Sequence, residues 1–191
     1  MTRFILPLAL CSFLGCLHPA PNPVSQYPSR LEFLGKTAIK FREQGGKKSN
    51  FAQYKEEDKR SDDRGWQFAI EYEKTDDTPQ SRSQQMQRVY QRMAENRKDA
   101  MGKAMLFEHR ERGLYITEAF LHDGDVEFHF IHVYRKADDG LGCYRFSRVD
   151  PTTCQGCEQK RVEQLILEGE SNRNRYFSEL FRVDLPMPRP N

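Results

Sequence analysis

The sequence has little net charge and lacks the short motifs that identify the commoner enzyme classes. Its 191 residues carry 30 Lys and Arg side chains against 28 Asp and Glu, a formal net charge of +2. The two signs are mixed along the chain, so no basic stripe predicts nucleic-acid binding and no acidic block predicts a solvating tail. There is no G-x-S-x-G, no P-loop, no H-E-x-x-H and no dinucleotide glycine fingerprint. We therefore expect no nucleic-acid partner, no bound metal and no cofactor.

The N-terminal residues differ in kind from the rest of the chain. Arg3 precedes about a dozen mostly apolar residues without a charge, a pattern typical of a secretory signal and too short to span a bilayer comfortably. The run ends in FLGC at Cys16, and four prolines follow before residue 29. We predict a signal peptide at 1–15 and an extended tether at 16–29.

The FLGC stretch resembles the lipobox of bacterial lipoproteins, in which removal of the signal exposes a cysteine that becomes acylated. The small Gly15 fits that pattern, whereas Phe13 stands where leucine is usual. The resemblance implies an acylated Cys16 that holds the protein on a lipid bilayer. Leu17 follows the cysteine where aspartate would signal inner-membrane retention, which favours the outer membrane, facing the periplasm. The alternative is an ordinary cleaved signal with an incidental Cys16.

The folded part is predicted to be mainly antiparallel strands. Turn signals at Arg112-Gly113, Asp123-Gly124 and Asp139-Gly140 separate alternating runs, and Asp-Gly between such runs indicates a hairpin. The predicted strands lie at 103–110, 114–121, 126–135 and 142–149, with a further strand at 66–74 and one or two within 30–42. The polar stretch between 43 and 65 is predicted to be a long loop.

Two segments have the apolar spacing of helices. One is 84–101, with Ser81 or Ser83 as the candidate cap, and the other is 153–182, with a candidate break near Gly169. Strands followed by helices, joined by hairpins, indicate an α+β domain. We expect an antiparallel meander sheet of about five to six strands with two or three helices on one face. This single domain covers 30–185, and 186–191 form a tail.

One predicted hairpin carries the best candidate for chemistry. With Asp123-Gly124 as its loop, His129 lies opposite Glu118 and shares a sheet face with Glu127. An enzyme could use these three as an acid/base pair with a second carboxylate, but no third metal ligand or nucleophile stands at a recognisable spacing. The simpler interpretation is a solvated outer face, with Leu121, Phe128 and Phe130 on the core face. His132, on that core face, is predicted to be a hydrogen-bonded interior histidine.

Two further groups of residues are candidates for contacts. Phe51 and Tyr54 stand among charged residues of the polar stretch, and we predict that they contact a protein partner or else anchor the loop. Cys143, Cys154 and Cys157 remain after the signal and Cys16 are set aside. In an exported protein we favour a disulfide from Cys143 to Cys154 or Cys157, ahead of a redox dithiol and of a metal site.

These features favour a lipid-anchored binding or inhibitory module of the bacterial envelope over an envelope enzyme. The leader followed by FLGKTAIKF resembles the start of immunity lipoproteins that neutralise type VI secretion phospholipase effectors, through Gly35, Lys36 and the strand from Ile39 to Phe41. The chain departs from that family in having one domain's worth of residues rather than two. It is similar to small PsbP-like envelope lipoproteins to the same degree. The resemblance implies an immunity protein against a secreted effector.

Overall fold

The chain folds as two successive blocks of four strands and a helix. The computed structural model describes residues 27–57, 65–96, 100–123, 126–151, 158–182 and 185–186. The first block contains β1 (Arg30–Phe33), β2 (Lys36–Gly45), β3 (Ser49–Glu56), β4 (Gly65–Glu73) and α1 (Pro79–Asn96). The second contains β5 (Ala100–His109), the short 3₁₀ helix η1 (Arg110–Arg112), β6 (Leu114–Asp123), β7 (Val126–Ala137), β8 (Gly140–Pro151) and α2 (Glu158–Leu180). The predicted signal peptide, Cys16 and the predicted tether up to residue 26 lie outside the described residues, whereas Tyr27, in the last part of that predicted tether, is buried in the core.

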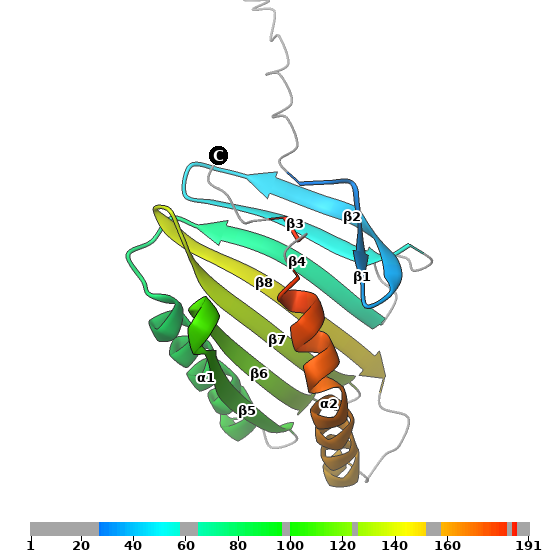
Figure 1. The fold of residues 1–191 in the computed structure, drawn as a ribbon. Helices are drawn as coiled ribbons and strands as arrows, with labels where there is room; N and C mark the ends of the chain where they lie inside the picture. The colour runs from blue at the N-terminus through cyan, green and yellow to red at the C-terminus, as the bar shows by residue number, and fades with distance from the viewer. Residues whose placement is uncertain are drawn as a thin grey trace, which may run out of the picture.

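All eight strands belong to one antiparallel sheet, in the order β1-β2-β3-β4-β8-β7-β6-β5. Each block is a meander, and the two meanders meet where β4 pairs with β8. Helix α1 carries the chain from β4 in the middle of the sheet to β5 at its far edge (Figure 1). The prediction of an α+β fold with an antiparallel sheet is confirmed, whereas the predicted number of strands is too low.

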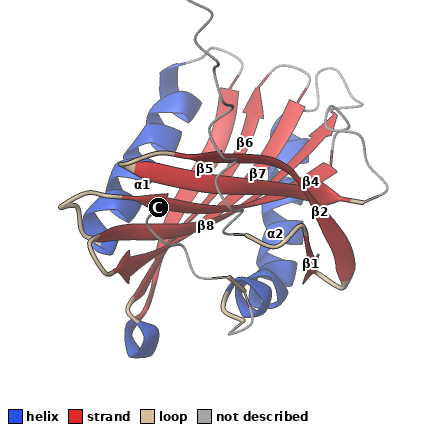
Figure 2. Ribbon diagram, turned by 90° about the horizontal axis from the view of Figure 1, so that it is seen from above, coloured by secondary structure: helices blue, strands red, loops and turns tan. Residues whose placement is uncertain are grey.

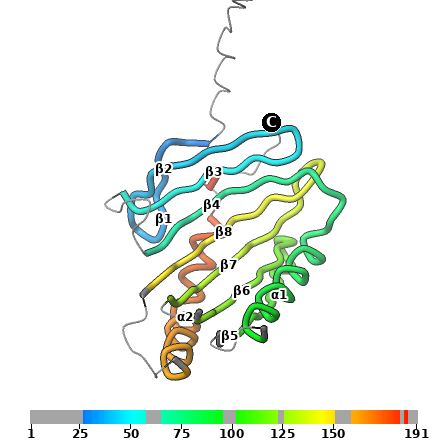
Figure 3. The backbone as a smooth tube through the Cα atoms, turned by 180° about the vertical axis from the view of Figure 1, so that it is seen from behind, coloured from blue at the N-terminus to red at the C-terminus, as the bar shows by residue number. Residues whose placement is uncertain are grey.

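The two helices pack on opposite faces of the sheet, which corrects the expectation that they share one. Helix α2 lies in front of the sheet in Figure 1, and α1 lies in front of it when the molecule is seen from behind (Figure 3). Side chains alternate along a strand, so Glu118, Phe120 and His129 point to the α2 face, and Ala119, Leu121 and Phe130 to the α1 face. Seen from above, the strand direction turns strongly across the sheet (Figure 2), as sheet twist requires.

Each face has its own hydrophobic core. The larger core, on the α2 face, is rich in aromatic rings and includes Phe33, Phe68 and Phe146. Phe33 stacks on Phe68 with ring centroids 4.5 Å apart. The smaller core lies under α1 and centres on Tyr90 and Leu121. Because helices cover parts of both faces, strands β6 and β7 have buried side chains on each side.

Helix α1 begins and ends about five residues earlier than predicted. Pro79 occupies its first position, where a missing N–H is no loss. Thr78 is the cap, because its Oγ1 accepts a hydrogen bond from Ser81 N and its own N donates to Ser81 Oγ, both at 3.1 Å. Ser81 therefore completes a capping box instead of starting the helix. Ser83 is buried and bonds Thr117 Oγ1 at 2.9 Å.

The polar stretch predicted as a loop is largely a β-hairpin. Strand β2 continues to Gly45, and β3 returns beside it with Phe51 opposite Gln44. Alternate residues of β3, namely Asn50, Ala52 and Tyr54, are buried, so one face of this strand belongs to the core. Where one or two strands were predicted within 30–42, the structure has two, with Leu34 (φ 55°) and Gly35 (φ 73°) forming the turn between them.

The β6–β7 hairpin keeps the predicted faces but not the predicted register. Strand β6 extends through Asp123, so Glu118 lies opposite Ile131 and Phe120 opposite His129. This differs from the expected pairing by two residues. A shift of two positions leaves every side chain on the same face, because side chains alternate with a period of two.

Candidate functional site

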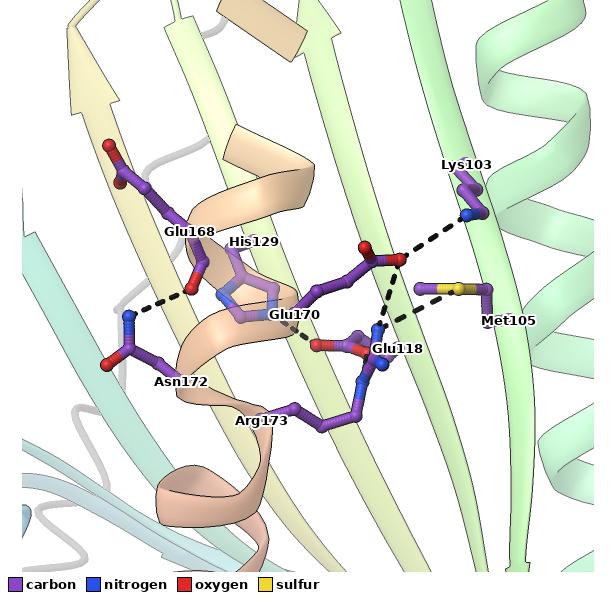
Figure 4. A network of polar contacts seen from close by, with 8 residues as sticks. All are labelled: Lys103, Met105, Glu118, His129, Glu168, Glu170, Asn172 and Arg173. Carbon is purple, nitrogen blue, oxygen red and sulfur yellow. Dashed lines mark hydrogen bonds and ion pairs between the residues drawn. The ribbon is translucent and has the colours of Figure 1, made fainter. Parts of the chain in front are cut away.

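Helix α2 lies over a buried polar cluster formed by Glu118, His129 and Arg173. Glu118 on β6 is fully buried, and His129 on β7 is 2% exposed. Arg173 reaches down from α2, and its Nε donates to Glu118 Oε2 at 2.6 Å. His129 Nε2 lies 2.9 Å from Glu118 Oε1 (Figure 4). Since a carboxylate paired with arginine only accepts hydrogen bonds, Nε2 carries the donated proton.

Aromatic rings enclose the histidine. The ring of His129 stacks on Phe120 with centroids 4.4 Å apart, and Tyr176 of α2 meets it edge-on at 5.5 Å. Burial is the main reason why the pKa of His129 is lowered, although the hydrogen bond that it donates to Glu118 opposes this shift. The imidazole is therefore neutral near pH 7.

A glycine in the middle of α2 permits this close packing. Gly169 lies directly over Phe120, and a Cβ atom at this position would overlap Cε1 and Cζ of the ring. The helix is continuous through Gly169, so the candidate break predicted there is not found. The glycine signal marks a close approach between helix and sheet.

A second carboxylate on the same face is held in the same way. Arg161 of α2 binds Glu127 with two bonds, Nε to Oε1 at 2.8 Å and Nη2 to Oε2 at 3.1 Å. Glu127 is 2% exposed. Such bidentate pairs combine strength with a fixed geometry. Two arginines twelve residues apart thus attach α2 to the sheet at separate points.

The structure brings together the three residues of the predicted acid/base site, but in a buried position. Glu118, Glu127 and His129 share one sheet face as predicted, and the expectation that this face is solvated is wrong because α2 covers it. Both carboxylates are already paired with arginine. A general base must reach a proton of the substrate, and these atoms do not reach the surface. The arrangement can orient and lock α2, and it offers no access to a substrate.

Sequence reasoning missed Arg161 and Arg173, although α2 itself contains a signal for one of them. Its buried stripe runs through Leu165, Gly169, Tyr176 and Leu180. Arg173 stands four residues after Gly169 and three before Tyr176, and therefore falls on this stripe. Because a buried arginine is almost always paired, an arginine on the buried side of a helix predicts a carboxylate on the element that packs against it.

On the α1 face, His132 is an interior histidine, as predicted. It is 4% exposed, and its two ring nitrogens each lie 3.0 Å from a tyrosine hydroxyl, Tyr90 and Tyr134. Burial, with the neighbouring Arg145, lowers the pKa of His132 to about 3. Nearby Cys143 is buried, which raises its pKa well above that of a free thiol. Neither group is poised for chemistry at neutral pH.

The other predicted cysteines lie outside the described residues, as Cys154 and Cys157 fall between β8 and α2. Among the described residues, no group of three or more His, Cys, Asp or Glu side chains could hold a metal ion. Within the same ranges, no helix is long and apolar enough to cross a membrane.

Among the described residues, no helix covers part of the α1 face. Helix α1 lies over β5, β6 and β7, and from behind the neighbouring strands have no helix in front of them (Figure 3). We call this region the open surface. The register places the following residues on it: Phe51, Gln53, Lys55, Gln67, Ala69, Glu71, Arg145, Ser147 and Val149, with Phe128 and Phe130 at the border with α1.

The two predicted partner-contact residues fall on different faces. Phe51 belongs to the open surface, where it is partly exposed and lies under the Arg42 guanidinium at 5.2 Å. Tyr54 points the other way, is fully buried and donates to the carbonyl of Pro28 at 3.1 Å. Tyr54 is therefore a core residue, because only every second residue of β3 faces outward.

The open surface is apolar at its border with α1 and mixed elsewhere, where Phe51, Ala69 and Val149 lie among polar residues. The rings of Phe128 and Phe130 stack at 5.6 Å, and Phe130 stacks in turn on Tyr90 at 5.2 Å. Arg145 pairs with Glu71 at 2.8 Å, and Lys55 adds one further positive charge to the surface.

Comparison of the chain with family models, with curated proteins and with solved structures finds no match.

Proposed function

We propose that this protein is a lipid-anchored binding module of the bacterial envelope and that it recognises a protein partner through the open surface. Acylated Cys16 would hold it at the outer membrane, facing the periplasm, with the tether before the folded domain. Inhibition of a secreted effector, as in immunity proteins, is the specific form that we favour.

One observation carries the proposal: in the part of the chain that the structure describes, a region of the α1 face has no covering helix yet carries aromatic side chains. Phe51, Phe128 and Phe130 are partly exposed there, beside polar and charged residues. Aromatic anchors ringed by polar groups are typical of protein interfaces. The alternative, an envelope enzyme using Glu118, Glu127 and His129, is not favoured by the described residues, because α2 covers all three.

A pair of matched substitutions tests the surface. The residues are Phe51 on the open surface and Leu167 on α2, which is 63% exposed on the opposite side of the sheet. Photo-crosslinking from position 51 in envelope preparations should yield one discrete adduct, and position 167 should yield none. With the captured protein purified, Phe51→Asp should weaken binding at least tenfold, whereas Leu167→Asp should leave it unchanged. Equal binding by both variants would exclude the open surface.

The anchor and the inhibitory role have separate tests. Labelled palmitate should enter the wild type but not Cys16→Ala, and equal labelling of the two would rule out the anchor. If the captured partner is a toxin, co-expression of the wild type should protect cells from it and Phe51→Asp should not. Protection by both proteins would separate inhibition from the open surface.

A further inference from the structure

A second surface feature lies at the C-terminal end of α2. Where α2 ends, a cavity of about 460 Å³ opens between the helix and the sheet. This volume falls within the range of small-molecule sites. Its lining includes three arginines and three leucines: Arg112, Arg135, Arg182, Leu114, Leu180 and Leu185.

The cavity is apolar at its base. Leu114, Leu180 and Leu185 are each at most 6% exposed, and the rings of Tyr144 and Phe181 complete the wall. Such a base binds a hydrocarbon group by removing its surface from water. A fully hydrated inorganic ion would gain nothing from these contacts.

The arginines give the cavity a positive charge that the described residues only partly neutralise. Arg182 pairs with Glu179 at 2.9 Å. Arg112 donates to the carbonyl of Phe181 at 2.8 Å, and Arg135 lies 3.4 Å from the hydroxyl of Tyr144. Neither Arg112 nor Arg135 forms an ion pair with a carboxylate in the described part of the chain. The C-terminal end of α2 contributes about half a negative charge, so the described lining of the cavity keeps a net positive charge.

We infer that this cavity binds an amphipathic anion: a carboxylate or phosphate head held by Arg112 and Arg135, with a short apolar chain against the leucines. A guanidinium presents several donors in a plane and suits both kinds of head group. The site is independent of the open surface, which lies on the other face of the sheet. It therefore adds a small-molecule ligand to a protein proposed to bind a protein partner.

The test compares three probes on the full chain carrying Cys16→Ala. Isothermal titration should show binding of octyl phosphate, with weaker binding of both inorganic phosphate and octyl glucoside. Amide shifts in NMR spectra should place octyl phosphate beside Leu114 and Leu180. Equal binding of octyl glucoside would overturn the anionic requirement, equal binding of phosphate would overturn the apolar one, and no binding of octyl phosphate would overturn the site.

Variants at matched arginines locate the head group. Arg135→Gln should weaken octyl phosphate binding about ten- to a hundredfold, the usual effect of losing a charge-assisted bond. Arg110→Gln, on the same short helix as Arg112 but with a side chain 87% exposed, should change nothing. An equal loss in both variants would indicate nonspecific charge attraction and overturn the assignment. Thermal unfolding of each variant verifies that it remains folded.

Vesicles separate the two sources of such a ligand. Sedimentation with phosphatidylglycerol vesicles that is absent with phosphatidylcholine and lost in Arg135→Gln would identify a membrane lipid. Octyl phosphate binding without sedimentation would identify a free amphiphile. Binding of octyl phosphate and sedimentation with vesicles do not depend on whether Phe51→Asp loses its protein partner. The proposal of a protein-binding surface and the proposal of an anion-binding cavity can therefore be refuted independently.

Discussion

Replacing Arg173 by methionine should destabilise the protein by about 3–4 kcal/mol. Removing one partner of a buried ion pair costs about 3–5 kcal/mol, because the other charge stays buried. Glu118 is fully buried, but Arg173 keeps 20% of its side-chain exposure, which favours the lower end, about 3 kcal/mol. The guanidinium also lies 4.7 Å above the Phe107 ring, a contact that adds about 0.5–1 kcal/mol. Methionine keeps the apolar stem and removes only the charge.

Urea unfolding followed by circular dichroism measures this loss. The control is Arg175→Met, because Arg175 is exposed and donates only to the carbonyl of Leu34 at 3.0 Å; we expect a change of less than about 1 kcal/mol. The double variant Glu118→Gln/Arg173→Met should recover part of the loss, since no unpaired charge remains. Similar stabilities for Arg173→Met and Arg175→Met, with unchanged denaturant slopes, would refute the view that this pair locks α2.

Three further predictions follow from single residues. Burial and Arg145 lower the pKa of His132 to about 3, so between pH 3 and 6.5 the unfolded chain binds the extra proton. The free energy of unfolding should therefore fall below pH 6.5, by about 2 kcal/mol at pH 5 from this residue, and a titration of stability against pH should be flatter in His132→Gln; equal slopes would contradict this. Gly169→Ala should destabilise by about 1–3 kcal/mol by overlapping Phe120, against the stabilisation of about 1 kcal/mol usual inside a helix, and a rise in melting temperature would show that the contact is absent. Cys143 should not pair with Cys154, because eight residues of extended strand, about 26 Å, separate Cys143 from Pro151, and three further residues span at most about 11 Å, which keeps the two Cα atoms beyond bonding distance; Cys143 is also buried, so alkylation with mass spectrometry should label it only after unfolding, and a peptide with Cys143 disulfide-linked to Cys154 would contradict this.

Local patterns predicted the parts of the fold that depend on neighbouring residues. Turn signals and alternation located the strands from β5 to β8 to within a few residues. Alternation also placed Glu118, Glu127 and His129 on one face, and this survived a register error because the error was an even number of residues. Which face would be buried was not a local property. It depends on α2, whose arginines lie more than 30 residues further along the chain.

Strand β3 was not predicted, because the polar residues on its outward face made the whole segment look like a loop. Gln53 and Lys55 alternate with the buried Ala52 and Tyr54, which is the pattern of a strand with one solvated face. The surrounding charges and the Gly45-Gly46 pair favoured a loop instead. Both Phe51 and Tyr54 were consequently expected at the surface. Phe51 is partly exposed, whereas Tyr54 is buried on the other face of the strand.

The geometry of the sheet explains why, in the described residues, part of one face has no covering helix. Eight strands at about 4.8 Å spacing make a sheet about 34 Å wide, whereas a helix with its side chains is about 10 Å across. One helix per face cannot cover such a width. On the α2 face, Tyr27 and Leu185 from the two ends of the described chain pack on the part of the sheet that the helix does not reach, and both belong to the core there. On the α1 face the described residues provide no such cover, and the two-residue stack of Phe128 and Phe130 continues outward from the helix. A partner that extended this stack over β8 and β4 would bury apolar surface that the chain itself leaves open, and it would meet Phe51 at the far side.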